Sequence, residues 1–188
     1  MSTRDAIVDA ACSCLKTSGA RDITVAMVAR AAKVSSALVH YHFATKRQLL
    51  AAAAVQLARR RAERRGAALQ SARGLAGLDA LWSALAEGGE RVAPDLILLG
   101  REDRETRTLL QVERRRELTL VAGAVGRMLT SLGAAPPLTA EDLGATVCTF
   151  LDGAAAALAG GTAAADVRAS YDAFWLALVA LGQTGPSR

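Results

Sequence analysis

The sequence of 188 residues predicts an all-α protein of about nine helices, and three observations support this fold class. Apolar residues recur with the 3.6-residue period of a helix in almost every segment. No segment shows the sustained alternation of apolar and polar residues that a half-buried strand requires. Alanine is abundant and β-branched residues are sparse, which favours helices over strands. Because 52% of the residues are hydrophobic, the chain can bury a sizeable core.

The first helix is expected over about 3–18. Ser2 can cap its N-terminus, and Asp5 stands where the returning acid of a capping box is needed. Gly19 follows the last apolar position and is expected to end the helix.

Two short helices follow. The second begins after Thr24, a good N-cap residue, and runs to about residue 31. The third begins at Ser35 or Ser36 and ends near His42. Two short helices joined by a tight turn form a helix-turn-helix, in which the second helix enters the major groove of DNA and the first braces it.

The remaining helices form the body of the protein. Thr45 and Gln48 form a capping box that opens the fourth helix, which is expected to run to about residue 65. Pro94 is expected to interrupt the helices that follow. These are expected over 76–91, 95–100, 104–132, 140–159 and 164–181. We therefore expect a helix-turn-helix DNA-binding domain over 1–46 and a second, helical domain, the body, over 47–188, with the fourth helix connecting them.

The charge of the chain is unevenly distributed. Residues 1–74 hold 13 Lys and Arg against four Asp and Glu, whereas residues 75–188 hold 10 against 14. The first segment is therefore at +9 and the second at −4, which suggests that one end of the molecule faces a polyanion. The arginines between 59 and 65 are interpreted as a solvated helix face, with a DNA contact as the alternative.

Residues 4–50 resemble the DNA-binding domain of the TetR family of regulators. The resemblance is densest in the run Leu38-Val39-His40-Tyr41-His42-Phe43, followed by Lys46 and Leu49-Leu50. It covers about a quarter of the chain, and the remainder matches the family only in architecture. The chain departs from the family pattern at Lys33, where glycine is usual in the turn, and at His40, where tyrosine is usual. A lysine at a position that needs positive φ would be strained.

The expected DNA contacts lie in and beside the third helix. Hydroxyls at the N-termini of helices can bind phosphates or base edges, a small residue can touch a thymine methyl, and a lysine can bind a phosphate. The candidate DNA-binding residues are Thr24, Ser35, Ser36, Ala37, His40, Tyr41 and Lys46. Val39 and Phe43 are expected in the core, and His42 is either a packed core residue or a phosphate contact.

The body is expected to dimerise and to hold a ligand. A single short recognition helix supplies few contacts, so helix-turn-helix proteins usually read two half-sites as dimers. The resemblance implies that the last two helices pair with those of a second copy in a four-helix bundle, with intramolecular core as the alternative. The candidate interface residues are Cys148, Asp152, Ala156, Val167, Tyr171, Phe174 and Leu178. The resemblance also implies a small-molecule pocket, for which the candidates are Trp82, Leu85, Leu98, Arg114, Met128, Phe150 and Trp175.

The sequence therefore predicts a ligand-responsive transcriptional regulator, with a repressor as the leading form. It would bind a partly palindromic operator in double-stranded DNA as a homodimer and be released by a small-molecule effector. The alternatives are a helical interaction protein that does not read DNA and an enzyme. An enzyme is disfavoured because His40 and His42 are the only histidines and no glycine-rich phosphate loop is present, so neither a metal nor a cofactor is expected.

Two further expectations concern the cysteines and the location of the protein. Cys12, Cys14 and Cys148 match no metal-binding spacing and are expected to be small, buried or half-buried thiols, with redox sensing as the minor alternative. No secretion signal or membrane span is expected, which implies a cytoplasmic protein.

Overall fold

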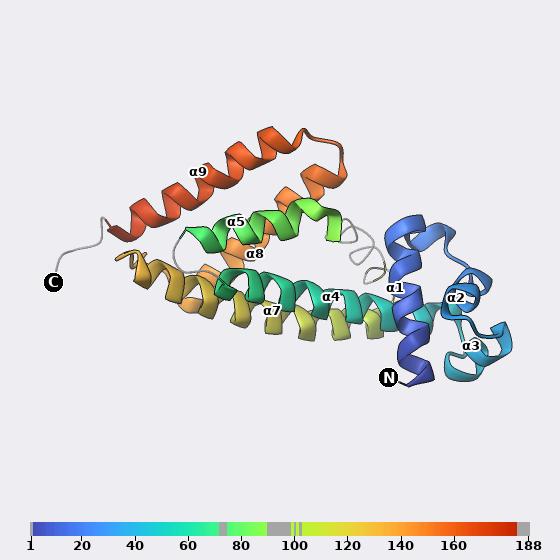
Figure 1. Ribbon diagram of the computed structural model, residues 1–188. Coiled ribbons are helices and arrows are strands. Elements are labelled where there is room, and N and C mark those ends of the chain that lie inside the picture. Colours follow the sequence, from blue (N-terminus) through green and yellow to red (C-terminus); the bar gives the residue numbers. More distant parts are fainter. Residues whose placement is uncertain (1, 72–74, 90–98, 100, 102, 184–188) are drawn as a thin grey trace. The chain divides into compact units, whose positions relative to one another are not determined.

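A computed structural model describes residues 2–71, 75–89, 99, 101 and 103–183 (Figure 1). Within these ranges every regular element is a helix, which confirms the all-α prediction. The elements are α1 (Thr3–Asp22), α2 (Val25–Ala32), α3 (Ser36–His42), α4 (Lys46–Ser71), α5 (Ala76–Ala84), the π-helix η1 (Leu85–Gly89), α7 (Arg104–Ser131), α8 (Ala140–Ala159) and α9 (Ala164–Gln183).

The chain divides into two compact units. The head unit comprises Met1–Arg60 and Val92–Glu113, and the body unit comprises Arg61–Arg91 and Arg114–Arg188. The long helices α4 and α7 therefore each contribute residues to both units.

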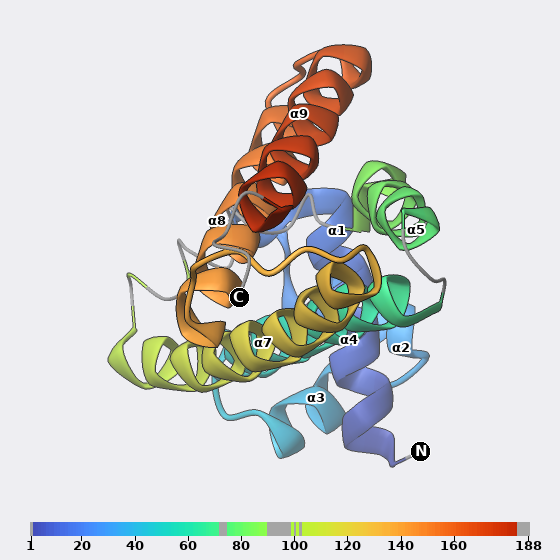
Figure 2. The same cartoon turned by 90° about the vertical axis from the view of Figure 1, so that its left-hand side faces the viewer.

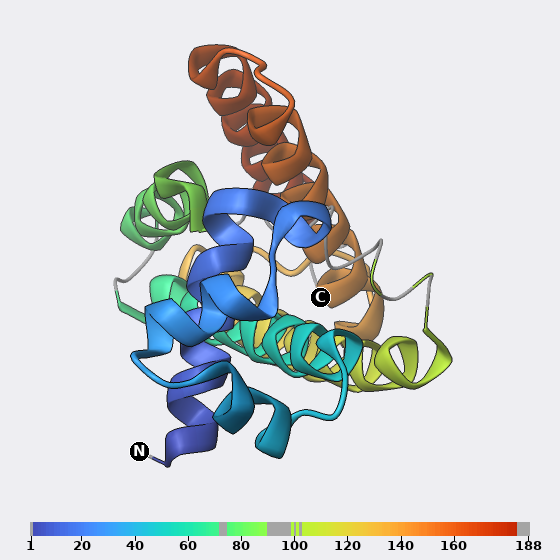
Figure 3. The ribbon, with the colours of Figure 1, turned by 90° about the vertical axis from the view of Figure 1, so that its right-hand side faces the viewer.

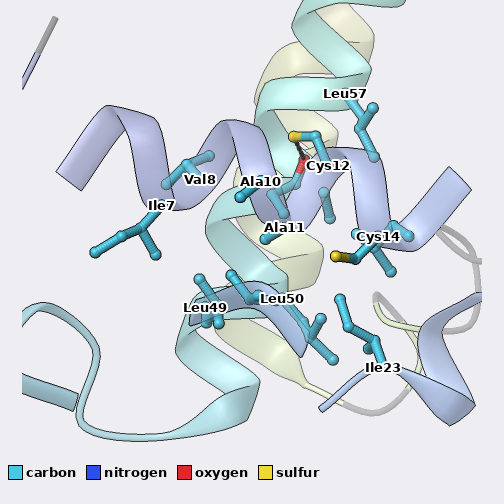
Figure 4. Packing of buried hydrophobic residues seen from close by; sticks show 14 of the residues in the cluster. Ile7, Val8, Ala10, Ala11, Cys12, Cys14, Ile23, Leu49, Leu50 and Leu57 are labelled. Atoms are coloured by element: carbon cyan, nitrogen blue, oxygen red, sulfur yellow. Dashed lines mark hydrogen bonds between the residues drawn. The ribbon is translucent and has the colours of Figure 1, made fainter. Parts of the chain in front are cut away.

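The head unit is built around apolar residues from its first four helices. Ile7 and Leu15 of α1, Val28 of α2, Val39 of α3 and Leu49 of α4 are each no more than 1% exposed. Figure 4 shows side chains of α1 and α4 that meet in this cluster, among them Ile7 and Leu49. Removing these side chains from water supplies the main stabilisation of the small helical head.

Helix α1 confirms its predicted cap and differs at its end. The hydroxyl of Ser2 accepts from the amide of Asp5 at 3.2 Å, and the carboxylate of Asp5 accepts from the amide of Ser2 at 3.0 Å. Gly19 leaves the helical conformation at φ 73°, as a terminating glycine should, but the chain resumes a helical turn that extends to Asp22.

The three cysteines are buried thiols, as predicted. The thiol of Cys12 donates to the carbonyl oxygen of Ala53 at 3.5 Å, the contact drawn in Figure 4. Burial raises the pKa of Cys12 and of Cys148 to about 11. Both thiols are therefore protonated at neutral pH, which makes them poor nucleophiles.

The body unit contains two close helix contacts at glycines. A Cβ atom at Gly144 of α8 would lie 2.6 Å from the carbonyl oxygen of Leu118 in α7. At the end of α9, a Cβ atom at Gly182 would lie 2.8 Å from the amide nitrogen of Ala135, which donates to the carbonyl oxygen of Gly182 at 2.9 Å. Figure 2 shows α8 and α9 as an adjacent pair.

Two body helices differ from the prediction. Helix α4 continues past the expected end to Ser71, because Gly66 lies buried inside it and packing offsets the roughly 1 kcal/mol cost of a helical glycine. Helix α5 ends at Ala84 and passes into η1. The predicted break at Pro94 and most of the helix over 95–100 lie outside the described residues.

Helix α8 is long and apolar enough to span a membrane by length and composition alone, with a mean hydropathy of 1.2. The core helix of a globular protein meets the same criterion. Leu143, Val147 and Leu151 of α8 are buried within the body unit, and Asp152 of the same helix forms ion pairs with arginines.

Candidate nucleic-acid interface

The helix-turn-helix is formed by α2 and α3 in the head unit. The hydroxyl oxygen of Thr24 accepts from the amide of Met27 at 3.2 Å, and that of Ser35 accepts from the amide of Leu38 at 3.1 Å. Each hydroxyl therefore caps its helix with its oxygen and keeps its own hydrogen available for a further acceptor. Figure 3 shows α2 and α3 beside α1, in the blue part of the ribbon.

The turn between the two helices is closed by Lys33 in the left-handed conformation, at φ 58° and ψ 41°. The amide of Lys33 donates to the carbonyl oxygen of Arg30 at 3.1 Å, and that of Val34 donates to Ala29 at 2.9 Å. The backbone therefore has the conformation for which glycine is favoured, and a lysine adopts it here at some steric cost.

Helix α3 has one buried and one exposed face. Val39 and, just after the helix, Phe43 are 1% and 4% exposed, so both belong to the core as predicted. The exposed face consists of Ser36, Ala37, His40 and Tyr41. Residues four positions apart are neighbours on the surface of a helix, so these two adjacent pairs lie on one side of it. Tyr41 is 83% exposed, so most of its side chain is free of packing against the rest of the chain.

The start of α4 follows α3 closely in the sequence. The hydroxyl of Thr45 accepts from the amide of Gln48 at 3.1 Å, and the side-chain oxygen of Gln48 accepts from the amide of Ala44 at 3.0 Å. The cap fixes the orientation of the first turn, where Lys46 is exposed. The ammonium of Lys46 lies 3.5 Å from the carbonyl oxygen of Arg21, which leaves donors for a phosphate.

The charge of this region is strongly positive. Between residues 21 and 47 the chain carries five lysines and arginines and one acidic residue, all exposed. They are Arg21, Arg30, Lys33, Lys46 and Arg47, with Asp22 as the acid. Such a surface attracts the phosphate backbone of nucleic acid without regard to sequence.

His42 is neither fully buried, as a packed core residue would be, nor fully exposed, as a phosphate contact would be. It is half-buried, and its ring makes an edge contact with Tyr41 at a centroid distance of 5.2 Å. Nearby, the guanidinium of Arg4 lies over the ring of Phe43 at 5.0 Å. The contact of Arg4 with Phe43 joins the N-terminal part of α1 to the residue that follows α3.

The arginine run of α4 is only in part the solvated face that its charge predicted, because Arg59 and Arg60 remain 45% and 39% exposed but are paired. In the head unit, Arg59 pairs with Glu113 at 2.7 Å and Arg60 pairs with Asp9 at 2.6 Å. In the body unit, Arg65 is 1% exposed and pairs with the buried carboxylate of Glu117 at 3.0 Å. The sequence did not indicate these ion pairs because the acidic partners lie about 50 residues away in the chain, where no local pattern reveals them.

The predicted dimer residues fall into two groups. Cys148, Val167, Tyr171 and Leu178 are buried within the single chain, and the hydroxyl of Tyr171 donates to the carbonyl oxygen of Leu78 at 2.7 Å. Their burial assigns these four to the core of the body unit. Asp152 and Phe174 are partly exposed and Ala156 is exposed, so these three reach the surface.

Most of the predicted pocket residues gather in one part of the body unit. Trp82, Met128, Phe150 and Trp175 belong to the same hydrophobic cluster, whose aromatic rings include Phe150 and Phe174 stacked at 4.0 Å. Leu85 lies in a neighbouring cluster, which Trp82 also contacts. Arg114 pairs with two carboxylates, and Leu98 lies outside the described residues.

A groove of about 750 Å³ lies in the head unit, and the described pocket candidates are not among its lining residues. It is lined by α1, the turn before α4, the first turns of α4 and the start of α7, and it includes Arg4, Phe43, Arg47 and Asp103. Its lining mixes both signs of charge with apolar side chains, and no pattern in the sequence indicated it.

Comparison with known proteins agrees with this geometry. The model of the family "Bacterial regulatory proteins, tetR family" matches residues 7–53, which contain α2, α3 and the start of α4. No curated protein matches the sequence significantly.

The fold of the whole chain is similar to that of several solved structures. A transcriptional regulator from Rhodococcus sp. RHA1 superposes with a TM-score of 0.78 at 19% identity, covering 97% of this chain and 100% of that one. A protein described as a TetR-family regulator from Rhodococcus sp. gives 0.76 at 18% identity, covering 94% and 98%. A regulator from Saccharomonospora viridis in complex with choline gives 0.68 at 18% identity, covering 91% and 94%. Residues 7–53 therefore contain the helix-turn-helix that is matched by the tetR family of bacterial regulatory proteins, and almost the full length of the chain shares the fold of solved structures described as transcriptional regulators.

Proposed function

We propose that the protein is a repressor that binds a partly palindromic operator as a homodimer and leaves it when a small molecule binds the body unit. The observation that carries this proposal is the exposed face of α3, flanked by exposed lysines before and after it. Ser36, Ala37 and His40 are proposed to read base edges, and Thr24, Ser35, Tyr41 and Lys46 to contact the backbone.

The proposal of a homodimer rests on the exposed faces of α8 and α9. Small or apolar residues line both faces at helical spacing, and Leu176 is 72% exposed. On α8 these are Thr146, Thr149, Gly153 and Ala156, and on α9 they are Ala169, Ala173, Leu176, Ala177 and Ala180. Small side chains let helices approach closely, so these faces suit a bundle formed with a second copy. The dimer would place two recognition helices on half-sites about 34 Å apart.

The proposal of a small-molecule effector rests on the aromatic cluster of the body unit. Rings supply apolar walls, and the side chains of Trp82, Phe150 and Phe174 are only partly buried. An effector that binds one conformation of the body more tightly than another shifts the population toward that conformation. The protein then leaves the operator if this conformation fits the DNA poorly. A cytoplasmic location, where such a regulator meets its operator, belongs to the same proposal.

A binding experiment with matched DNA tests the proposal. We expect the purified protein to bind a labelled duplex from upstream of its own gene, and a specific unlabelled duplex to compete far better than a scrambled one. The measurement is fluorescence anisotropy at fixed salt, since affinity for DNA depends steeply on salt. Equal competition by both duplexes would remove the support for sequence-specific regulation. A helical interaction protein, the competing function, would bind neither duplex.

A further inference from the structure

The backbone of Lys33 holds a conformation that suits a different residue. Lys33 lies in the turn between α2 and α3 at φ 58° and ψ 41°, and among the described residues it is the one non-glycine residue with positive φ. Glycine adopts this conformation without a steric penalty, whereas a Cβ atom makes it costly. Backbone strain of this kind is concentrated at binding sites, which directs attention to the side chain of Lys33.

The charge of Lys33 has no partner within the described chain. Lys33 is exposed, and its ammonium forms no hydrogen bond or ion pair with another residue that the structure describes. A cation at the C-terminus of α2 also interacts favourably with the helix dipole, but Arg30 already places a cation in the last turn of this helix. The ammonium of Lys33 is therefore available to a group outside the chain.

The turn precedes the end of α3 that a helix-turn-helix directs at the bases. The N-terminal residues of the recognition helix contact base edges, and here Ser36 and Ala37 are exposed at that end. Lys33 stands just before α3 in the sequence and Lys46 just after it, and both are exposed. At 1.5 Å per residue α3 is about 10 Å long, close to the roughly 12 Å width of the major groove. A lysine beyond either end of α3 can therefore reach the phosphates at the edges of the groove.

We infer that Lys33 contacts a phosphate of the DNA backbone, different from the phosphate proposed for Lys46, and that its strained backbone is retained for this contact. An ammonium brings three donors and a full positive charge to a phosphate. The inference deepens the proposed function and rests on it, because it adds a backbone contact at the N-terminal end of the recognition helix. Stability and affinity for DNA should therefore oppose each other at this position.

Three substitutions of Lys33 in the full chain separate the backbone from the charge. Lys33→Asn removes the charge and keeps a residue that tolerates positive φ, Lys33→Gly removes both the charge and the strain, and Lys33→Arg keeps both. Each variant is titrated by fluorescence anisotropy against the labelled upstream duplex and a labelled scrambled duplex at several salt concentrations.

Loss of the charge should weaken binding to both duplexes. Lys33→Asn and Lys33→Gly should each bind about fivefold to tenfold more weakly at about 0.1 M salt, with the slope of log K against log salt lowered by about 0.9, because one phosphate contact is lost. Lys33→Arg should keep both the affinity and the slope. Lys16→Asn, which removes an exposed lysine of α1, is the matched control and should leave both nearly unchanged.

Thermal unfolding of the same samples shows whether weaker binding comes from a damaged head. Lys33→Gly should melt about 1–4 °C above the wild type because the strain is relieved, and Lys33→Asn should melt no lower than the wild type. A variant that is more stable and yet binds DNA more weakly has lost a contact rather than its fold.

The double variant Lys33→Asn with Lys46→Ala tests whether the two lysines contact separate phosphates. Separate contacts should lower the slope by about 1.8 in total, whereas a fall of about 0.9 would mean a shared phosphate and would contradict that part of the inference. An unchanged slope in both Lys33→Asn and Lys33→Gly, or an equal fall in Lys16→Asn, would overturn the inference as a whole.

The two duplexes distinguish this inference from the proposed function. If the wild type binds both duplexes equally and Lys33→Asn lowers both slopes, the phosphate contact stands and sequence-specific regulation fails. If the wild type prefers the upstream duplex and the Lys33 variants keep its slope, only the inference fails. If the wild type binds neither duplex, both fail.

Discussion

The guanidinium of Arg65 and the carboxylate of Glu117 form an ion pair of 3.0 Å in which both side chains are only 1% exposed. A pair of this kind contributes little to stability relative to apolar residues of the same size, yet the loss of one partner leaves an uncompensated charge in the interior. The loss of one partner therefore lowers stability by far more than the formation of the pair raises it.

The first prediction follows from that asymmetry. Glu117→Gln should destabilise the fold by about 3–5 kcal/mol, because the buried guanidinium of Arg65 would lose the charge of its buried partner. Urea unfolding followed by circular dichroism measures the change. Glu63→Gln, which affects only an exposed pair, should change the free energy of unfolding by less than about 1 kcal/mol. Similar losses in the two variants would contradict the buried assignment.

The second prediction concerns Lys46. Lys46→Ala should weaken binding to specific and scrambled DNA alike, and the slope of log K against log salt should fall by about 1, because one phosphate contact is lost. Anisotropy titrations at several salt concentrations measure both quantities. Lys16→Ala, an exposed lysine of α1, serves as the control and should leave the slope nearly unchanged. An unchanged slope for Lys46→Ala would exclude Lys46 from the interface.

The third prediction concerns the backbone of Lys33. Lys33→Gly should stabilise the head by about 0.5–1 kcal/mol, since glycine adopts positive φ without a steric penalty. Lys16→Gly, inside the regular part of α1, should instead cost about 1 kcal/mol. Thermal or urea unfolding compares the two directly. A loss of stability at both positions would show that the turn at Lys33 carries no strain.

The fourth prediction uses two glycines of the body unit. Gly144→Ala should destabilise the protein by about 1–3 kcal/mol, because its Cβ would lie 2.6 Å from the carbonyl oxygen of Leu118. Gly126→Ala, in α7, meets nothing within 4 Å and should stabilise by up to about 1 kcal/mol. In urea unfolding, the two substitutions should change the free energy of unfolding in opposite directions. A change in the same direction would mean that α7 and α8 adjust to an added methyl group.

The fifth prediction tests the proposed dimer. A Cβ atom at Gly153 meets nothing within 4 Å in the single chain, so Gly153→Leu should fold normally. It should nevertheless convert the dimer to a monomer, as measured by light scattering after size exclusion. Arg127→Leu, which adds an apolar residue to an exposed position of α7, should remain a dimer. Retention of the dimer in Gly153→Leu would place the interface elsewhere.

Local signals predicted the fold well. The predicted caps at Ser2, Thr24, Ser35 and Thr45 lie at the starts of observed helices, because a capping hydrogen bond spans only three residues and can be recognised in the sequence. The inner and outer faces of α3 follow from the same local periodicity. The positions of its exposed residues on DNA remain predictions.

The features that the sequence did not reveal depend on distant partners. Arg65 lies 52 residues from Glu117 and 87 from Asp152, so its burial has no local signature. The periodicity of α9 identified Tyr171 as apolar-facing and did not reveal whether that face meets the same chain or a second copy. Tyr171 is 0% exposed in the single chain, so this residue packs within its own chain.

The hydrogen bond from the amide of Ala135 to the carbonyl oxygen of Gly182 joins the approach to α8 with the end of α9. The segment between these two residues is therefore closed into a loop, with Gly182 packed too tightly against Ala134 to admit a side chain. Fraying that begins at the end of α9 would break this closure and loosen the entry to α8 as well. The two helices should consequently open as one cooperative substructure, rather than one after the other.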